Sequence, residues 1–105
     1  MTIKYDKLVR DNIPSIIKEQ GKMPMTRILS DDEYIDCLGK KLFEEVGEYL
    51  ENSSIEEFGD ILEVLEAIKK AKGFFDADIE AVKTAKAKKN GKFDKKILLE
   101  EVVEV

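Results

Sequence analysis

The stretch LGKKLFEEVGEYLENSSIEEFGDILEVLEAIKKA, residues 38–71, decides the fold. On both sides of a polar break at residues 52–54, apolar residues recur at intervals of three and four. This spacing predicts two amphipathic helices. The connection between them is short but still allows the two helices to be antiparallel neighbours.

The boundaries of these two helices are marked by capping signals. Residues 30–33 read Ser-Asp-Asp-Glu, which fits a capping box in which Ser30 and Glu33 bind each other's free backbone amides. The first helix is therefore expected to follow Ser30 and to run to about Leu50. The second is expected over residues 55–72, with Gly73 as its stop.

Two further helices are predicted outside this stretch. A short one lies between residues 11 and 21, with Pro14 in its first turn. Another covers residues 76–89 and is closed by Asn-Gly. Residues 3–8 are expected to form a short extended arm, whereas the spacing over residues 97–105 leaves strand, helix and partner-docking arm open.

These elements predict an all-α fold, a helical bundle of about three to four helices with short irregular or extended N- and C-terminal arms. At 105 residues, the chain has the length of one domain, residues 1–105. The apolar arc on residues 55–72 is too wide to be covered from within so small a bundle. We therefore expect dimerisation to complete the core.

Composition excludes several classes of function. The net charge is -5 without a dense basic block, so duplex nucleic acid is a poor partner. Histidine is absent and Cys37 is the single cysteine, which argues against a catalytic triad, a histidine-ligated metal and an internal disulfide. With no leader and no long apolar run, the sequence predicts a cytoplasmic protein without a membrane partner.

Carboxylates gather at helical spacing on the two central helices. At about 100° per residue, Glu45 and Glu48 lie at the rim of the first apolar stripe, whereas Glu57 and Asp60 lie within the second. Because a buried unpaired carboxylate costs several kcal/mol, such acids usually have a cation beside them. The expected cation is Mg²⁺, which takes oxygen ligands and is typically coordinated by substrate phosphates as well as by carboxylates.

Ordinary helix chemistry offers an alternative for some of these acids. Glu57 falls three residues after Ser54, and Glu56 three residues after Ser53, so either pair fits a second capping box, and acids are favoured in a first turn. Glu44 and Glu48 can pair with lysines on a solvated face. Asp60 is the hardest to explain in this way, because it lies past the first turn among apolar neighbours and Asp is a poor residue for a helix interior.

Four basic residues are candidates for phosphate contact. Lys86 and Lys89 lie on the fourth helix, where a solvated face with favourable positive charge at the C-terminus is the simpler interpretation. Lys7 and Arg10 near the N-terminus raise the same question, although isolated basic residues are usually surface charges.

The acid pairs and several other segments together resemble one family. Glu-x-x-Glu at residues 45–48 followed by Glu-x-x-Asp at residues 57–60 resembles the signature of the all-α nucleoside triphosphate pyrophosphatases, the MazG-like and phosphoribosyl-ATP pyrophosphohydrolase-like superfamily. Residues 5–14, YDKLVRDNIP, look like the Lys-Leu-Val-Arg-Asp-Lys-Ile-Pro opening of the phosphoribosyl-ATP pyrophosphohydrolase-like branch. Segments at residues 31–34, 41–45, 60–64 and 91–93 also look like that branch.

This resemblance implies an activity and assigns roles to residues. It implies a metal-dependent nucleotide pyrophosphohydrolase that assembles at least as a dimer and splits the α-β phosphate bond into a nucleoside monophosphate and pyrophosphate. The implied cofactor is Mg²⁺, for which Mn²⁺ can substitute. Its ligands would be Glu45, Glu48, Glu57 and Asp60, with Glu44 orienting or activating the attacking water and Lys86 and Lys89 holding phosphates.

The expected role is removal of unwanted nucleoside triphosphates from the nucleotide pool. Two alternatives stay open at this point: a phosphoribosyl-ATP pyrophosphohydrolase of histidine synthesis, and a catalytically silent helical module that binds a nucleotide or a protein. An ordinary structural bundle with capping acids is a third.

Overall fold

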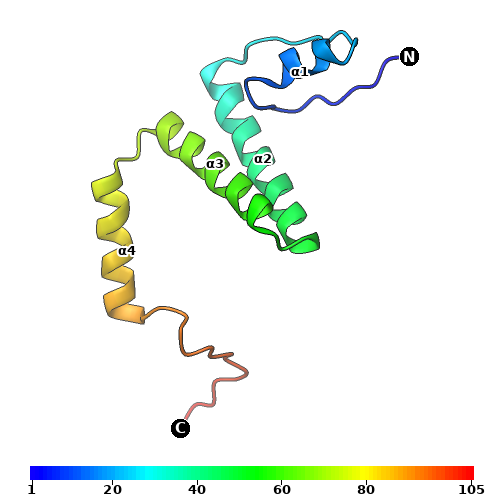
Figure 1. The fold of residues 1–105 in the computed structure, drawn as a ribbon. Helices are drawn as coiled ribbons and strands as arrows, with labels where there is room; N and C mark the ends of the chain where they lie inside the picture. Colours follow the sequence, from blue (N-terminus) through cyan, green and yellow to red (C-terminus); the bar gives the residue numbers. More distant parts are fainter. The chain divides into compact units, whose positions relative to one another are not determined.

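The computed structural model describes residues 1–105 and contains four helices and no strand (Figure 1). The helices are α1 (Ile13–Glu19), α2 (Asp31–Glu51), α3 (Ile55–Lys72) and α4 (Asp76–Asn90). The all-α prediction is therefore confirmed, and each helix lies close to its expected bounds. Both terminal segments, including residues 97–105, contain neither helix nor strand.

The chain divides into two compact units, Met1–Gly73 and Phe74–Val105. The first contains α1, α2 and α3, and the second contains α4 and the C-terminal segment. The interpretation of the whole chain as one functional domain stays a prediction.

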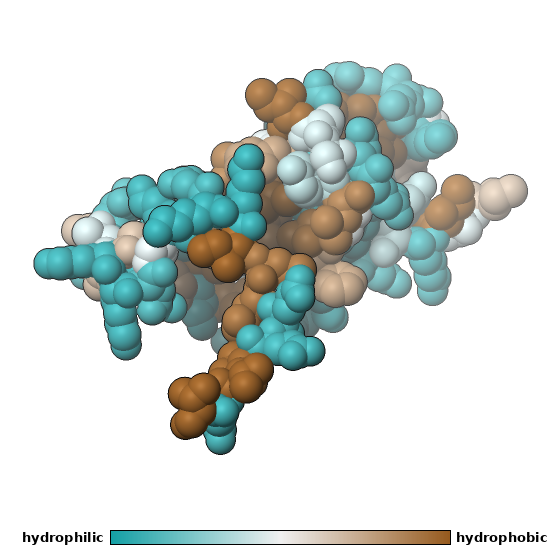
Figure 2. All heavy atoms as spheres, turned by 90° about the horizontal axis from the view of Figure 1, so that it is seen from below, coloured by the Kyte–Doolittle hydropathy of each residue, from teal (hydrophilic) through white to brown (hydrophobic).

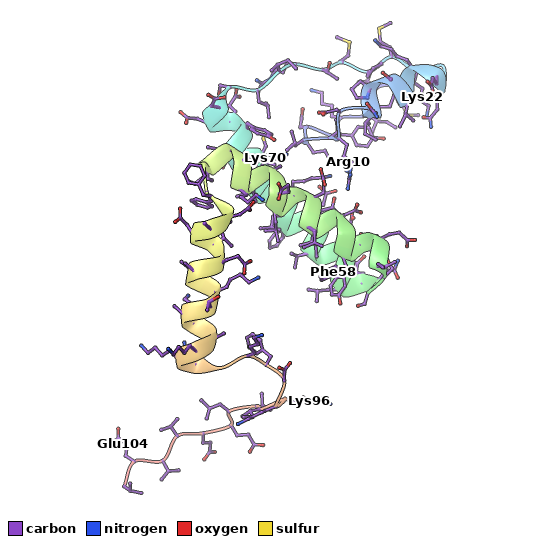
Figure 3. All side chains as sticks on the ribbon, turned by 60° about the vertical axis from the view of Figure 1, so that its left-hand side comes forward. Arg10, Lys22, Phe58, Lys70, Lys96 and Glu104 are labelled. Atoms are coloured by element: carbon purple, nitrogen blue, oxygen red, sulfur yellow. The ribbon has the colours of Figure 1, made fainter.

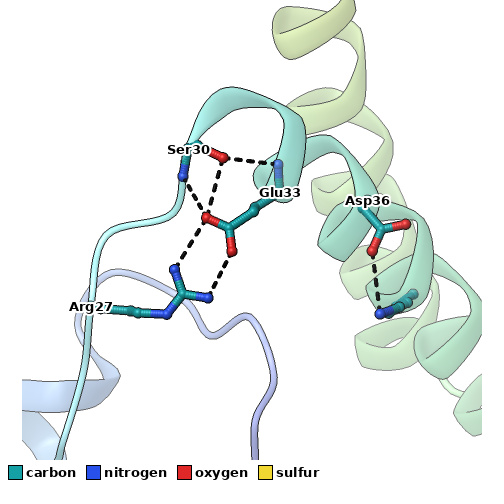
Figure 4. Close-up of polar contacts among 5 residues, drawn as sticks. Arg27, Ser30, Glu33 and Asp36 are labelled. Atoms are coloured by element: carbon teal, nitrogen blue, oxygen red, sulfur yellow. Dashed lines mark hydrogen bonds and ion pairs between the residues drawn. The ribbon is translucent and has the colours of Figure 1, made fainter.

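A complete capping box begins α2, as the sequence predicts (Figure 4). Ser30 Oγ accepts the Glu33 N–H at 3.3 Å, and Glu33 Oε1 accepts the Ser30 N–H at 3.2 Å. Arg27 donates to both Glu33 oxygens, at 3.1 and 2.7 Å. The hydrogen bonds from Arg27, and then those from Ser30, lower the pKa of Glu33 to about 2, so this carboxylate stays ionised.

The ends of α3 are also built from local chemistry. Ser54 Oγ accepts the Glu57 N–H at 3.2 Å and caps the N-terminus. At the C-terminus, Gly73 adopts φ 70°, a left-handed conformation that glycine reaches without strain. These caps set the two ends of α3, which has 18 residues against 21 in α2.

Within the first unit, α2 and α3 form an antiparallel hairpin and pack against each other (Figure 1). Leu38 on α2 is 3% exposed and Val64 on α3 is 9% exposed. Near the connection, the rings of Tyr49 and Phe58 meet edge to face with centroids 6.2 Å apart. The third buried residue of the chain is charged: Glu45, at 7% exposure.

The hairpin has one apolar side and one charged side. We define its apolar face by six exposed residues, Phe43, Val46 and Leu50 on α2 and Phe58, Leu62 and Leu65 on α3. At about 100° per residue, both groups are rotated in the same sense from the buried line of their helix, which in antiparallel neighbours brings them to one side. Hydrophobic residues at the surface are visible in Figure 2.

None of the four helices combines the length and the apolar character that a membrane-spanning helix requires.

Candidate metal centre

Three carboxylates of the hairpin meet between α2 and α3. Glu45 from α2 and Glu57 and Asp60 from α3 each place one oxygen within 4.8 Å of the others. We call these three residues the acid triplet. The i, i+3 spacing on α3 points Glu57 and Asp60 to the same side of that helix, and the packing of the hairpin brings Glu45 opposite them.

The triplet contains two buried oxygens without a partner. Glu45 Oε2 and Glu57 Oε2 are inaccessible to solvent and accept no hydrogen bond. Buried polar atoms nearly always have a hydrogen-bond partner, so each unpartnered oxygen requires an explanation, and a bound ion is one of the usual ones. An oxygen-liganded divalent cation fits this donor set.

Glu45 is the most deeply buried of the three. Its side chain is 9% exposed, and Lys41 Nζ lies 3.4 Å from Oε1. Burial raises the pKa of the Glu45 carboxyl, and the charge of the neighbouring Glu48 raises it further, against the opposite effect of Lys41. The predicted rim position of Glu45 is thus wrong, because the side chain is enclosed between the packed helices.

Glu44 is held differently, by two lysines. Lys7 Nζ donates to Glu44 Oε1 at 3.1 Å, and Lys41 Nζ donates to Oε2 at 3.4 Å. Burial on its own would raise the pKa of Glu44, but the two ammonium groups outweigh it and the pKa lies below its ordinary value. Glu44 is therefore a fixed negative charge next to the triplet.

Asp60 is paired with Arg10 from the N-terminal segment. Arg10 Nη2 donates to Asp60 Oδ1 at 2.7 Å, and the two side chains are 59% and 39% exposed. In Figure 3, Arg10 and Phe58 lie on opposite sides of α3, so the N-terminal segment contacts the charged side of the hairpin. The sequence predicts that Asp60 lies within the apolar stripe of its helix. In the structure its side chain is only partly buried and lies at the edge of the site.

The second capping box predicted at α3 is only half formed. The Ser54 hydroxyl caps the helix, but the Glu57 side chain does not return the bond to the Ser54 amide. In α2 both halves are present. Helix capping therefore leaves the Glu57 carboxylate unexplained, with one of its oxygens orphaned in the triplet.

The remaining predicted site residues lie outside the triplet. Glu48 is an exposed residue whose charge acts on Glu45, and its role as a fourth ligand stays a prediction. Lys86 and Lys89 lie exposed on α4, in the second unit, and their contact with phosphate also stays a prediction.

A pocket of about 440 Å³ opens on the charged side of the same unit. It is lined by Asp11, Tyr34, Glu63, Glu66, Ala67, Lys70 and Ala71. Glu63 lies one helical turn after Asp60, and Asp11 follows Arg10 in the chain. None of the three triplet acids lines the pocket, which begins one helical turn along α3 from Asp60 and combines an aromatic ring with charged groups.

Sequence reasoning did not identify the ion pairs that Lys7 and Arg10 make with the acids of this site. These pairs join residues 37 and 50 positions apart, so no local spacing signals them. The inward direction of Glu45 follows from its position beside Leu38 and Leu42, although the residue is buried more deeply than the predicted rim position.

Comparison with known proteins adds little to this description. No protein-family profile matches the chain, and no solved structure matches it. A stretch of 42 residues is 55% identical to an uncharacterized protein of Mycolicibacterium smegmatis. The matched stretch is 40% of this chain and 43% of that protein, so the chain spans less than half of this relative's length.

Proposed function

We propose that this protein is a magnesium-dependent nucleotide pyrophosphohydrolase that splits the α-β phosphate bond of a nucleoside triphosphate or a related nucleotide. The observation that carries the proposal is the pair of buried, unpartnered carboxylate oxygens in the acid triplet. The resemblance of the acid spacing to the MazG-like superfamily supports it. We further propose that the role is removal of unwanted nucleotides from the cytoplasmic pool.

The triplet would hold the metal, with Glu48 as a further ligand. When bound, Mg²⁺ lowers the pKa of a bound water and neutralises charge that develops on the leaving pyrophosphate. The reaction adds water across the bond: its oxygen joins the α-phosphorus, and the bond from that phosphorus to the bridging oxygen breaks.

The chain's own residues would position the reactants. Glu44, with its lowered pKa, is a weak base, so it is better suited to orient the attacking water than to remove its proton completely. Lys7 and Arg10 reach Glu44 and Asp60 from the N-terminal segment and would contact the phosphates. The pocket that begins one helical turn along α3 from Asp60 would take the nucleoside part.

The test is a panel of nucleoside triphosphates and phosphoribosyl-ATP, assayed with Mg²⁺ and with Mn²⁺ for release of pyrophosphate as opposed to orthophosphate. We expect metal-dependent release that falls in Glu57→Gln by more than the roughly 10–100-fold typical for loss of an outer-shell metal partner. Glu56→Gln is the matched control, since Glu56 is the exposed neighbour on the same first turn.

The panel also separates the alternatives. Turnover of phosphoribosyl-ATP alone would assign the enzyme to histidine synthesis. No turnover of any nucleotide with either metal would leave the catalytically silent binding module in place of the enzyme.

A further inference from the structure

The cations nearest to the acid triplet come partly from outside the hairpin. Arg10 and Lys7 precede α1, yet they bond to Asp60 and Glu44 at 2.7 and 3.1 Å. Both pairs are substantially exposed, and exposed ion pairs contribute little and are screened by salt. The N-terminal segment is therefore held to the acids by contacts that a stronger competitor can replace.

The cations bonded to these acids contact some of the carboxylate oxygens and leave others without a partner. Arg10 occupies Asp60 Oδ1, whereas Glu45 Oε2 and Glu57 Oε2 have no partner. Together the five acids at the site (Glu44, Glu45, Glu48, Glu57 and Asp60) outnumber the three cations bonded to them (Lys7, Arg10 and Lys41). The bonded cations therefore do not match the formal negative charge of these acids.

We propose that Arg10 is an exchangeable counter-ion of Asp60: a divalent cation entering the acid triplet displaces the guanidinium, which then binds a phosphate group. Two cations on one small carboxylate repel each other, so the metal and Arg10 compete for Asp60. A freed guanidinium presents a planar fork of donors that matches phosphate oxygens. The first half of this exchange requires only the metal site, and the second half rests on the proposed function.

Calorimetric titration of the metal-free protein with Mn²⁺ at low ionic strength tests the competition. Arg10→Gln is expected to bind Mn²⁺ several-fold more tightly than the wild type. Lys7→Gln is the matched control, because it removes the same charge from the same segment but from a bond to Glu44, outside the triplet. Arg10→Lys, which keeps a cation, is expected to stay near the wild-type affinity.

If Arg10→Gln and Lys7→Gln gained the same affinity for Mn²⁺, the cause would be the general loss of positive charge, and the proposed exchange would be wrong. Unchanged or weaker Mn²⁺ binding by Arg10→Gln would overturn it as well. A circular-dichroism melt of each variant establishes that the helices are intact before titration.

Inorganic pyrophosphate provides the second readout, with the Mn²⁺-loaded protein. Arg10→Gln is expected to bind pyrophosphate several-fold more weakly while it binds the metal more tightly. A merely structural role for Arg10 would weaken both, and that result contradicts the proposal.

The two proposals fail separately. If Arg10→Gln bound Mn²⁺ more tightly and pyrophosphate more weakly, but the wild type hydrolysed no nucleotide, the proposed enzymatic function would be wrong and the proposed exchange would stand. If the wild type hydrolysed a nucleotide and Arg10→Gln bound Mn²⁺ with unchanged affinity, the enzymatic function would stand and the exchange would be wrong. A wild type that binds no Mn²⁺ overturns both.

Discussion

At the scale of single residues, Glu45 and Asp60 differ although both belong to the acid triplet. Glu45 is enclosed, with one oxygen 3.4 Å from Lys41 and the other unpartnered. Asp60 is half-exposed and bonded to Arg10. The energetic cost of bringing these carboxylates together therefore falls mainly on the buried Glu45, whereas Asp60 is already compensated by Arg10.

This difference predicts a substitution whose effect on stability changes sign with metal. In EDTA, Glu45→Gln should raise the free energy of unfolding by about 1–3 kcal/mol, because a neutral amide costs less to bury and can donate to the remaining carboxylates. With Mg²⁺ present, the wild type should gain melting temperature and the variant should gain little. Urea denaturation with and without Mg²⁺ measures both effects.

Glu51→Gln is the control for this experiment, since Glu51 is an exposed carboxylate on the last turn of the same helix. It should change stability by less than about 0.5 kcal/mol in either buffer. If Glu45→Gln were destabilising in EDTA, the pair with Lys41 would outweigh the burial cost and a structural role would be favoured.

At the scale of elements, the N-terminus of α2 is built more completely than that of α3. Ser30 and Glu33 satisfy each other's amides, and Arg27 secures the Glu33 carboxylate. In α3 the cap is one-sided, which leaves the Glu57 carboxylate available to the acid triplet. The Ser-x-x-Glu pattern therefore forms a complete capping box in α2, whereas in α3 its glutamate belongs to the acid triplet.

The α2 cap yields a stability prediction. Ser30→Ala should lower the free energy of unfolding by about 1 kcal/mol at pH 7, because the Glu33 amide loses its acceptor. Ser15→Ala, an exposed serine inside α1, should be close to neutral. Urea midpoints at constant m-value measure the difference, and equal midpoints for the two variants would contradict the prediction.

The contribution of the Glu33 carboxylate to the stability of the α2 cap can be isolated by varying the pH. Since the pKa of Glu33 falls from 4.5 to about 2 on folding, its contribution is fully present above pH 4.5 and is lost as pH falls toward 2. Glu33→Gln should therefore be less stable than the wild type at pH 7, and the gap should narrow steadily below pH 4.5. A gap that does not change between pH 5 and pH 2 would exclude the ionised carboxylate as its cause.

At the scale of the whole molecule, the chain buries very little apolar surface. Only Leu38 and Val64 are buried hydrophobic residues, whereas the apolar face of the hairpin stays exposed. A contiguous exposed patch of this kind usually marks an interaction site. We propose that a second copy of the chain covers this face, as expected from the wide apolar arc of α3.

The dimer is tested on the most exposed aromatic residue of that face. Phe43 is 83% exposed, so Phe43→Gln should leave the monomer fold intact and weaken self-association at least tenfold. Phe93→Gln, at a residue that is 96% exposed in the second unit, is the matched control and should not change association. Sedimentation equilibrium at micromolar concentration measures both, and a monomeric wild type would contradict the proposal.

The sequence by itself determined the helices of this protein and the group of acids among which the site lies. Helix ends depend on neighbours within four residues, such as Ser30 with Glu33, and the apolar period is local too. Only the tertiary structure decided which acids are buried and unpartnered, and which cations reach them. Arg10 and Asp60 are 50 residues apart, and the orphaned oxygen of Glu45 exists only because α2 and α3 pack around it.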